Sequence, residues 1–270
     1  MTIASAFTSQ TVSRTAVTID AAEVERKVKE MYRDVAENPF GDYHFEMGRG
    51  LAERLGYAPA DLDRIPSASI DSFAGVGFFF AEAALEEGER VVDFGSGSGM
   101  DTFIASLKVG ATGDVTGIDM SDDQLAKAQR LRNEAGVINI DYKKGYLDRI
   151  PCEDNCADVV ISNGVINLVP DKDAVFSEAA RLIRSGGRIA MCDIVSEKQL
   201  PDSITCNTSY WASCIGGAMQ EVDYLRGLEK AGFRIDYFAD NPEYRFISNG
   251  AVGAMDEYGV KSVTVVATRF

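Results

Sequence analysis

From about residue 89 onward, apolar and polar positions follow a repeating strand-and-helix pattern. Short apolar runs, typical of buried strands, alternate with segments in which apolar residues recur every three or four positions, as in amphipathic helices. The predicted strands are Arg90–Phe94, Asp114–Ile118, Ile138–Lys143, Cys156–Ser162, Arg188–Asp193, Arg234–Phe238 and Ser262–Ala267. The predicted helices are Asp101–Val109, Asp122–Ala135, Asp171–Ile183, which Gly186 and Gly187 are expected to close, and Glu221–Ala231. This order predicts an α/β fold with a Rossmann-like, seven-stranded, mostly parallel sheet and helices on both faces.

Before residue 89 the pattern is helical. Residues 1–19 lack a clear period and are expected to form an N-terminal arm. Residues 20–88 are expected to form a helical cap, with helices at Ala21–Ala36 and Glu46–Leu55 and a short one ending near Gly88. Residues 89–270 are expected to be the main domain, in which a segment at about 195–220 is inserted as part of a substrate lobe.

Composition excludes several classes of protein. The chain has 270 residues, of which 46% are hydrophobic, and a net charge of −15. No run approaches the roughly 20 apolar residues that span a bilayer, and the acidic balance is unfavourable for nucleic acid or an anionic membrane. Five cysteines, an odd number, favour reduced thiols over a disulfide framework. We expect a cytoplasmic protein without a nucleic-acid or membrane partner, and its oligomeric state stays open.

The most informative stretch is a glycine loop between the first predicted strand and helix. Gly95, Gly97 and Gly99 stand at alternate positions around Ser96 and Ser98, and Asp93 ends the strand before them. Such a loop lets a ligand lie against bare backbone at the helix N-terminus. A Cβ there is expected to hold the ligand off, and some of these positions are expected to need φ > 0.

An acidic residue after the second strand indicates the type of ligand. Asp119 lies 20 residues after Gly99, a position where a carboxylate accepts hydrogen bonds from the ribose hydroxyls of an adenosine compound. Asp93 beside the loop suits a cationic ligand and opposes a pyrophosphate. The loop also lacks the two-residue gap of the dinucleotide fingerprint. These features favour S-adenosyl-L-methionine over a dinucleotide.

Five motifs in chain order resemble those of the seven-stranded class I methyltransferases. They are Asp93–Gly99, Gly117–Ser121, Gly145–Pro151, Asp158–Asn163 and Leu182–Arg188. The resemblance implies that Asp119 holds the ribose, that Met120 packs on the adenine, and that Leu147 and Asp148 bracket and hydrogen-bond the base. It also implies that Gly95, Gly97 and Asn163 approach the methionine part. The turn that contains Ser72 and Gly75 would cover the cofactor.

A narrower resemblance, over about residues 56 to 235, is to the arsenite methyltransferase family. It is carried by Ser72–Gly77, Ser162–Lys172 and Cys214–Ala218. That family holds trivalent arsenic by several thiols, but this chain has Gly164 at one of the cysteine positions and no thiol in the upstream region. Only Cys214 matches. We therefore expect a small-molecule acceptor with an oxygen, sulfur or carbon nucleophile, and arsenite is the alternative.

Candidate catalytic residues are His44, Tyr43 and Cys214. His44, the only histidine, can take a proton near neutral pH, or it can simply satisfy a hydrogen-bond network at a helix start. Arg49 can hold a carboxylate or form a surface ion pair. Cys152 and Cys156 are four residues apart, but too few further ligands stand near them in the sequence, so no metal site is expected.

Two further functions remain open from the sequence. A nicotinamide-dependent oxidoreductase uses a similar sheet, although the loop spacing and the strand pair at the end of the chain count against it. A domain that binds the cofactor without catalysis is the other. A nucleic-acid methylase is disfavoured by the acidic charge and by Ser162–Val165 after the fourth strand.

Overall fold

A single mixed sheet organises the computed structural model, which describes residues 19–212 and 214–270. Its strands pair in the order β3-β2-β1-β4-β5-β8-β7, and a short β6 pairs with the end of β5. The strands are β1 (Arg90–Phe94), β2 (Asp114–Asp119), β3 (Ile140–Lys144), β4 (Ala157–Asn163), β5 (Ile183–Ser196), β6 (Met219–Gln220), β7 (Phe233–Asp240) and β8 (Val260–Arg269). The pairs among β1 to β5 are parallel, whereas β8 runs antiparallel to both β5 and β7. The predicted seven-stranded, mostly parallel sheet is confirmed, with β6 added.

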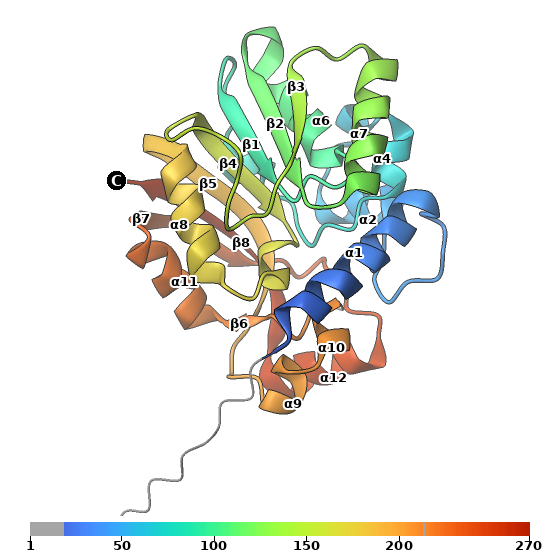
Figure 1. Ribbon diagram of the computed structural model, residues 1–270, viewed down its shortest axis with the longest axis vertical. Helices are drawn as coiled ribbons and strands as arrows, with labels where there is room; N and C mark the ends of the chain where they lie inside the picture. The colour runs from blue at the N-terminus through green and yellow to red at the C-terminus, as the bar shows by residue number, and fades with distance from the viewer. Residues whose placement is uncertain (1–18, 213) are drawn as a thin grey trace, which may run out of the picture.

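Helices cover both faces of the sheet, as Figure 1 shows, with α6 and α7 on one face and α8 and α11 on the other. Neighbouring residues of β1 illustrate the two layers, because Val91 belongs to one buried hydrophobic cluster and Val92 to the other. The helices after β1 are α6 (Met100–Val109), α7 (Asp122–Ala135), α8 (Lys172–Leu182), α9 (Asp202–Thr205), α10 (Thr208–Ala212), α11 (Glu221–Lys230) and α12 (Asn249–Tyr258), with 3-10 turns η1 (Gly110–Thr112) and η2 (Ile166–Leu168).

The segment before β1 is helical, as expected. It contains α1 (Ala21–Glu37), α2 (Gly48–Leu55), α3 (Pro59–Leu62), α4 (Ser67–Asp71) and α5 (Phe80–Ala83). Asp20 caps α1, since its side chain accepts hydrogen bonds from the backbone N–H groups of Ala22 and Glu23 at 3.1 Å. The predicted N-terminal arm lies, up to residue 18, outside the described residues.

Helix α1 is fixed beside the carboxyl ends of the parallel strands, where it packs against α7 and α10 (Figure 1). Two side chains of α7 hold its last turns. Gln124 Nε2 donates to the Tyr32 carbonyl at 2.7 Å, and Lys127 Nζ donates to the Ala36 carbonyl at 2.9 Å. Ser72 Oγ donates to the Val35 carbonyl at 3.0 Å. The bonds to Val35 and Ala36 satisfy carbonyl groups that a helix end leaves without a partner in the helix.

Two sequence predictions of elements are wrong. Gly186 and Gly187 do not close a helix. They lie in a bulge of β5 between the paired positions Ile183 and Arg188, where Gly186 has a φ of +77°. The helix expected to reach Gly88 ends at Ala83, because Ala84 turns into the left-handed region. Helix α12 was not predicted at all.

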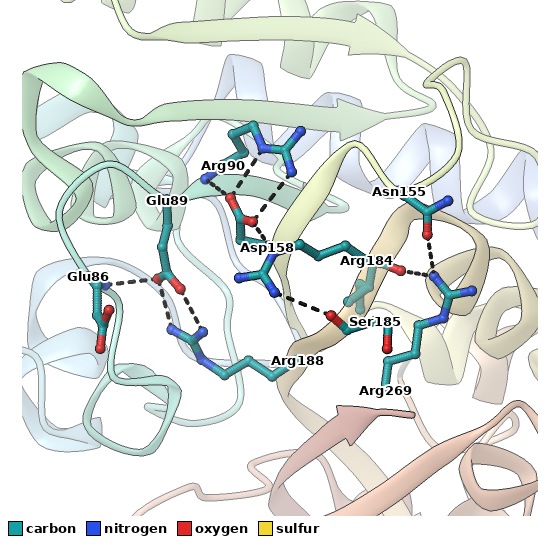
Figure 2. A network of polar contacts seen from close by, with 10 residues as sticks. Glu86, Glu89, Arg90, Asn155, Asp158, Arg184, Ser185, Arg188 and Arg269 are labelled. Atoms are coloured by element: carbon teal, nitrogen blue, oxygen red, sulfur yellow. Dashed lines mark hydrogen bonds and ion pairs between the residues drawn. The ribbon is translucent and has the colours of Figure 1, made fainter.

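The amino end of the sheet carries a network of ion pairs, shown in Figure 2. Asp158 of β4 accepts from the Arg90 backbone N–H at 2.8 Å and from Arg184 Nε at 2.5 Å. Glu89 forms a two-bond pair with Arg188 at 2.7 and 2.8 Å. This network joins the first residues of β1, β4 and β5.

Over the described residues, none of the helices has the length and apolar character required to cross a membrane.

Candidate functional site

A cavity of about 300 Å³ lies at the carboxyl ends of β1, β2 and β4, beneath α1. All but one of the residues predicted to bind the cofactor line it. They are Ser72, Gly75, Asp93, Gly95, Ser96, Gly97, Asp119, Met120, Leu147, Asp148 and Asn163. The exception is Gly99, which does not line the cavity. The structure therefore brings together, from five separate segments of the chain, the residues that the sequence grouped by motif.

The glycines of the loop have the positive φ that was expected at some of these positions, and two of them meet a further steric constraint. Gly95, Gly97 and Gly99 have φ values of +70°, +52° and +95°, which favour glycine. A Cβ on Gly95 would approach Val165 to 2.5 Å, and one on Gly99 would collide with the Tyr142 hydroxyl. At these two positions the obstruction is the protein's own chain and not a ligand.

Asp119 is held rigidly at the end of β2. Its Oδ2 accepts from the Gly97 N–H at 2.9 Å and its Oδ1 from the Ser121 N–H at 2.8 Å. Burial raises the pKa of this carboxyl, and the backbone hydrogen bonds oppose that rise. Each carboxylate oxygen keeps a further lone pair, so the group can accept the two hydroxyls of a ribose.

Two further carboxyl groups lie buried at the same cavity. Asp93 accepts from Thr102 Oγ1 at 2.6 Å. Asp101, which the sequence analysis did not propose, accepts from the Tyr57 hydroxyl at 2.5 Å and from Asn163 Nδ2 at 3.0 Å. Asp101 is the second residue of α6, so the first turn of the helix after the glycine loop was the signal that could have identified it.

The electrostatics of Asp93 and Asp101 favour a cationic ligand. Burial, and then the neighbouring Asp101 charge, raise the pKa of Asp93 to about 8. Burial raises the pKa of Asp101 to about 6, against the hydrogen bonds from Tyr57 and Asn163. A positive charge placed between these carboxyls would stabilise their ionised form. The pair therefore fits the ammonium and sulfonium of S-adenosylmethionine.

Asn163 connects β4 to the turn over the cavity. Its Oδ1 accepts from the Val76 N–H at 2.8 Å, and its Nδ2 donates to the Gly77 carbonyl at 3.1 Å and to the Tyr57 hydroxyl at 3.1 Å. Since the side chain is engaged by the protein on both ends, its main effect is to position the 72–77 turn and Asp101.

The other end of the cavity is closed by contacts between α1 and the loop after β3. Lys29 Nζ donates to Glu25 Oε1 at 2.6 Å and to the Tyr146 hydroxyl at 2.9 Å, and it lies 5.1 Å from the centre of the Tyr146 ring. Leu147 is buried next to Tyr146, and Asp148 follows it. Met120 is half-buried against the larger hydrophobic cluster.

Tyr43 and His44, predicted as catalytic residues, do not line the cavity. The Tyr43 hydroxyl donates to the Asn38 carbonyl at 2.9 Å. The ring of Phe45 stacks on Tyr43 and on Tyr32, with centres 5.7 and 6.2 Å apart, and meets His44 edge-on at 4.7 Å. Of these four aromatic side chains only Tyr32 lines the cavity. The Tyr43–Phe45 segment therefore contacts Tyr32 through the Phe45 ring and does not itself reach the cavity.

Cys214 also lies outside the cavity wall. It is buried with a φ of +61°, and Asn167 Nδ2 donates to its carbonyl at 3.0 Å. Its thiol interacts electrostatically with the Tyr32 hydroxyl, and burial raises the pKa of the thiol to about 11. A thiol with a raised pKa is a poor nucleophile and metal ligand.

The remaining predictions concern charge and metals. Arg49 forms ion pairs at 2.7 Å with both Glu53 and Asp63. Of the two roles considered for it, this is the surface ion pair and not the binding of a substrate carboxylate. Within residues 19–212 and 214–270, no three His, Cys, Asp or Glu side chains are arranged to hold a metal ion.

Comparison with known protein families gives two matches. A family described as a methyltransferase domain matches residues 85–232. Another, described as protein-L-isoaspartate(D-aspartate) O-methyltransferase, matches residues 12–153.

Among curated proteins, an arsenite methyltransferase of Halobacterium salinarum is 36% identical over 199 residues, which are 73% of this chain and 51% of that protein. The human arsenite methyltransferase is 34% identical over 53% of this chain and 40% of its own length. The chain thus spans about half the length of the curated relatives it matches.

Solved structures agree on the fold. The arsenic(III) S-adenosylmethionine methyltransferase of Chlamydomonas reinhardtii has a TM-score of 0.62 and 27% identity, over 83% of this chain and 75% of that one. Geranyl diphosphate C-methyltransferase of Streptomyces coelicolor, solved with S-adenosyl-L-homocysteine, has a TM-score of 0.65 and 16% identity over 94% of this chain and all of its own. The second likeness concerns the fold alone.

Proposed function

The chain belongs to the class I S-adenosylmethionine-dependent methyltransferases, and from that premise we propose that it methylates a small-molecule acceptor. The observation that carries the proposal is the arrangement of three carboxyls around one cavity at the glycine loop. Asp119 is oriented by two backbone N–H groups, and the buried Asp93 and Asp101 line the same cavity. A nicotinamide dinucleotide would place its pyrophosphate against these acids, which is unfavourable.

Most of what the protein contributes is positioning. When bound, S-adenosylmethionine supplies a methyl group already activated by its sulfonium. Asp119 would hold the ribose, Met120 and Leu147 would enclose the adenine, and Asp148 would accept from the base. Asp93 and Asp101 would hold the ammonium. With the cofactor fixed in this way, α1 excludes water above it, and alignment of the acceptor accounts for much of the rate.

The acceptor we favour carries an oxygen, sulfur or carbon nucleophile. The reason is that the cysteines of this chain are poorly placed to hold trivalent arsenic. Gly164, at a cysteine position of the arsenite methyltransferases, has a φ of +69°, a conformation that side chains rarely adopt. Cys214 is buried behind Tyr32. The described cysteines therefore do not provide the group of thiols that trivalent arsenic requires.

Arsenite is the second candidate, and the relatives favour it. Two curated proteins that match at 36% and 38% identity are named arsenite methyltransferases. Cys214 is the one thiol of this chain at a position that matches that family, so an arsenic acceptor would have to depend on it.

A combined binding and turnover experiment tests both candidates. Calorimetry is expected to show binding of S-adenosylmethionine and none of NADH, and loss of the former would contradict the proposal. Release of S-adenosylhomocysteine is then followed with phenols, thiols, enolisable ketones and arsenite plus glutathione. We expect turnover with an organic acceptor that survives Cys214→Ser. Turnover with arsenite alone, abolished by Cys214→Ser, would instead establish the second candidate.

A further inference from the structure

One face of α1 forms a continuous wall of the cavity. Ala21, Val24, Val28 and Tyr32 recur at helical spacing, and all four line the cavity. Val24 and Val28 are 2% and 3% exposed. The stripe faces away from the charged side of the helix, where Arg26 pairs with glutamates at i−3 and i+4.

The facing wall is equally apolar. It consists of Val165, Leu168, Val169 and Pro170, which follow the end of β4 and include part of the η2 turn. Phe73 of the covering turn completes the enclosure. These side chains follow Asn163 along the chain, and Val165 lies against the glycine loop, since a Cβ on Gly95 would approach it to 2.5 Å. A ligand between α1 and this segment would contact mostly hydrocarbon.

Tyr32 supplies a polar group to this apolar region. Its hydroxyl interacts electrostatically with the Cys214 thiol, and burial is the main cause that raises the pKa of this hydroxyl well above its ordinary value. The phenol thus keeps its proton. The oxygen still has a lone pair, so it can accept a hydrogen bond from a ligand.

The position of Tyr32 is fixed from two sides. Gln124 holds its carbonyl, and Ser98 Oγ of the glycine loop donates to Gln124 Oε1 at 2.5 Å. The Phe45 ring stacks behind the phenol. Two hydrogen bonds therefore connect the glycine loop to Tyr32, which holds this side chain in a constant relation to the cofactor site.

We propose that the methyl acceptor binds between the α1 stripe and the Val165–Pro170 segment and donates a hydrogen bond to the Tyr32 hydroxyl oxygen. The acceptor is then an uncharged, largely apolar molecule with one hydroxyl or thiol group. This inference rests on the proposed methyl transfer, because it assigns the acceptor side of the same cavity.

The charges around the cavity support an uncharged acceptor. Glu25, Asp93, Asp101, Asp119 and Asp148 all line it, so an anionic acceptor would be repelled. A cationic one would compete for the carboxyls that fit the cofactor. The lining Lys29 is held by Glu25 at 2.6 Å.

Fluorine NMR with three matched probes tests the inference. 4-Fluorophenol, 4-fluoroanisole and 4-fluorobenzoate are each titrated into the full chain at saturating S-adenosylhomocysteine. All three share a fluorinated ring. 4-Fluorophenol is uncharged and can donate a hydrogen bond, 4-fluoroanisole is uncharged and has no donor, and 4-fluorobenzoate is an anion. We expect 4-fluorophenol to bind about tenfold more tightly than 4-fluoroanisole, which is the size of one hydrogen bond, and 4-fluorobenzoate to bind weakest.

Tyr32→Phe keeps the ring and removes the hydroxyl. It is expected to abolish the preference for 4-fluorophenol and leave the affinity for S-adenosylhomocysteine unchanged. Tyr258→Phe is the matched control, because the Tyr258 hydroxyl donates to the exposed Glu257 carboxylate on α12. This variant should retain the wild-type preference.

Several results would overturn the inference. They are equal binding of phenol and anisole to the wild type, a preference that survives in Tyr32→Phe, tightest binding of the benzoate, or no binding of any probe. A parallel loss of S-adenosylhomocysteine affinity in Tyr32→Phe would assign this residue to the cofactor instead. Failure of the wild type to bind S-adenosylmethionine contradicts the proposed function, and calorimetry detects it separately.

Discussion

The pKa values of carboxyl groups are shifted in opposite directions at the two ends of the same parallel strands. At the amino end, burial tends to raise the pKa of Asp158, but hydrogen bonds from Arg90 and Arg184 outweigh it and lower the pKa to about 2. At the carboxyl end, burial raises the pKa of Asp93 to about 8 and that of Asp101 to about 6. Figure 2 shows the guanidinium groups that neutralise the acids of the amino end, whereas no arginine is among the described residues that line the cavity at the carboxyl end.

The difference separates acidic residues that stabilise the fold, at the amino end, from acidic residues that a ligand would stabilise, at the carboxyl end. The amino end satisfies its charges within the chain, so it contributes stability whether or not anything is bound. The carboxyl end holds Asp93 and Asp101 at a cost in free energy that a cationic ligand would offset. Perturbed groups at a cavity are the kind that mark functional sites.

The largest expected effect comes from removing charge at the carboxyl end. Asp93→Asn can still accept from Thr102, so the fold is retained. We expect the free energy of unfolding without cofactor at neutral pH to rise by about 2 kcal/mol, since the amide avoids the cost of protonating, or burying in ionised form, a carboxyl that is ionised in the unfolded chain. Affinity for S-adenosylmethionine should fall about tenfold. Urea denaturation measures the free energy of unfolding, and calorimetry measures the affinity. A variant in which both rise or both fall would contradict the comparison.

The pH dependence gives a smaller effect with a defined sign. Between pH 4 and pH 8 the folded Asp93 and Asp101 bind more protons than they do in the unfolded chain, because their pKa values are raised in the fold. The free energy of unfolding therefore falls as the pH rises through this range. From pH 5 to pH 8 we expect the wild type to lose about 1 to 2 kcal/mol more than Asp93→Asn. Parallel stability profiles would disprove this.

The smallest effect is expected at the amino end. Asp158→Asn weakens its pairs with Arg90 and Arg184, whose side chains are 47% and 49% exposed. Because water screens both guanidinium groups, we expect a loss of only about 1 kcal/mol of stability. Cofactor affinity should not change. A drop in affinity, measured by calorimetry, would show that the two ends are coupled.

Sequence reasoning succeeded where the chain is locally periodic or punctuated by glycine. Strand β1 and helix α7 have the predicted bounds, and the glycine loop and Asp119 meet at one cavity as expected. These features depend on neighbouring residues, so the pattern along the chain contains them. Gly186 was misjudged because a bulge in a strand and the end of a helix both favour glycine.

The missed and misplaced site residues depend on tertiary contacts. Asp101 becomes a site residue only because Tyr57 and Asn163, 44 and 62 residues away, orient it. His44 had suitable chemistry, but the Phe45 ring next to it packs toward Tyr32 and His44 does not reach the cavity. Residue type suggested a role for His44 and none for Asp101, because packing decides which side chain reaches the cavity.

The place of β8 in the sheet has a consequence for synthesis of the chain. Strand β8 lies between β5 and β7, and β7 has no strand partner in the described sheet other than β8. A nascent chain can therefore join β1 to β5 early, but the free edge of β5 stays unpaired until residues 260–269 leave the ribosome. Unpaired edges associate with other chains. The unpaired edge of β5 is thus open to association with other chains during the interval between the synthesis of β5 and that of β8.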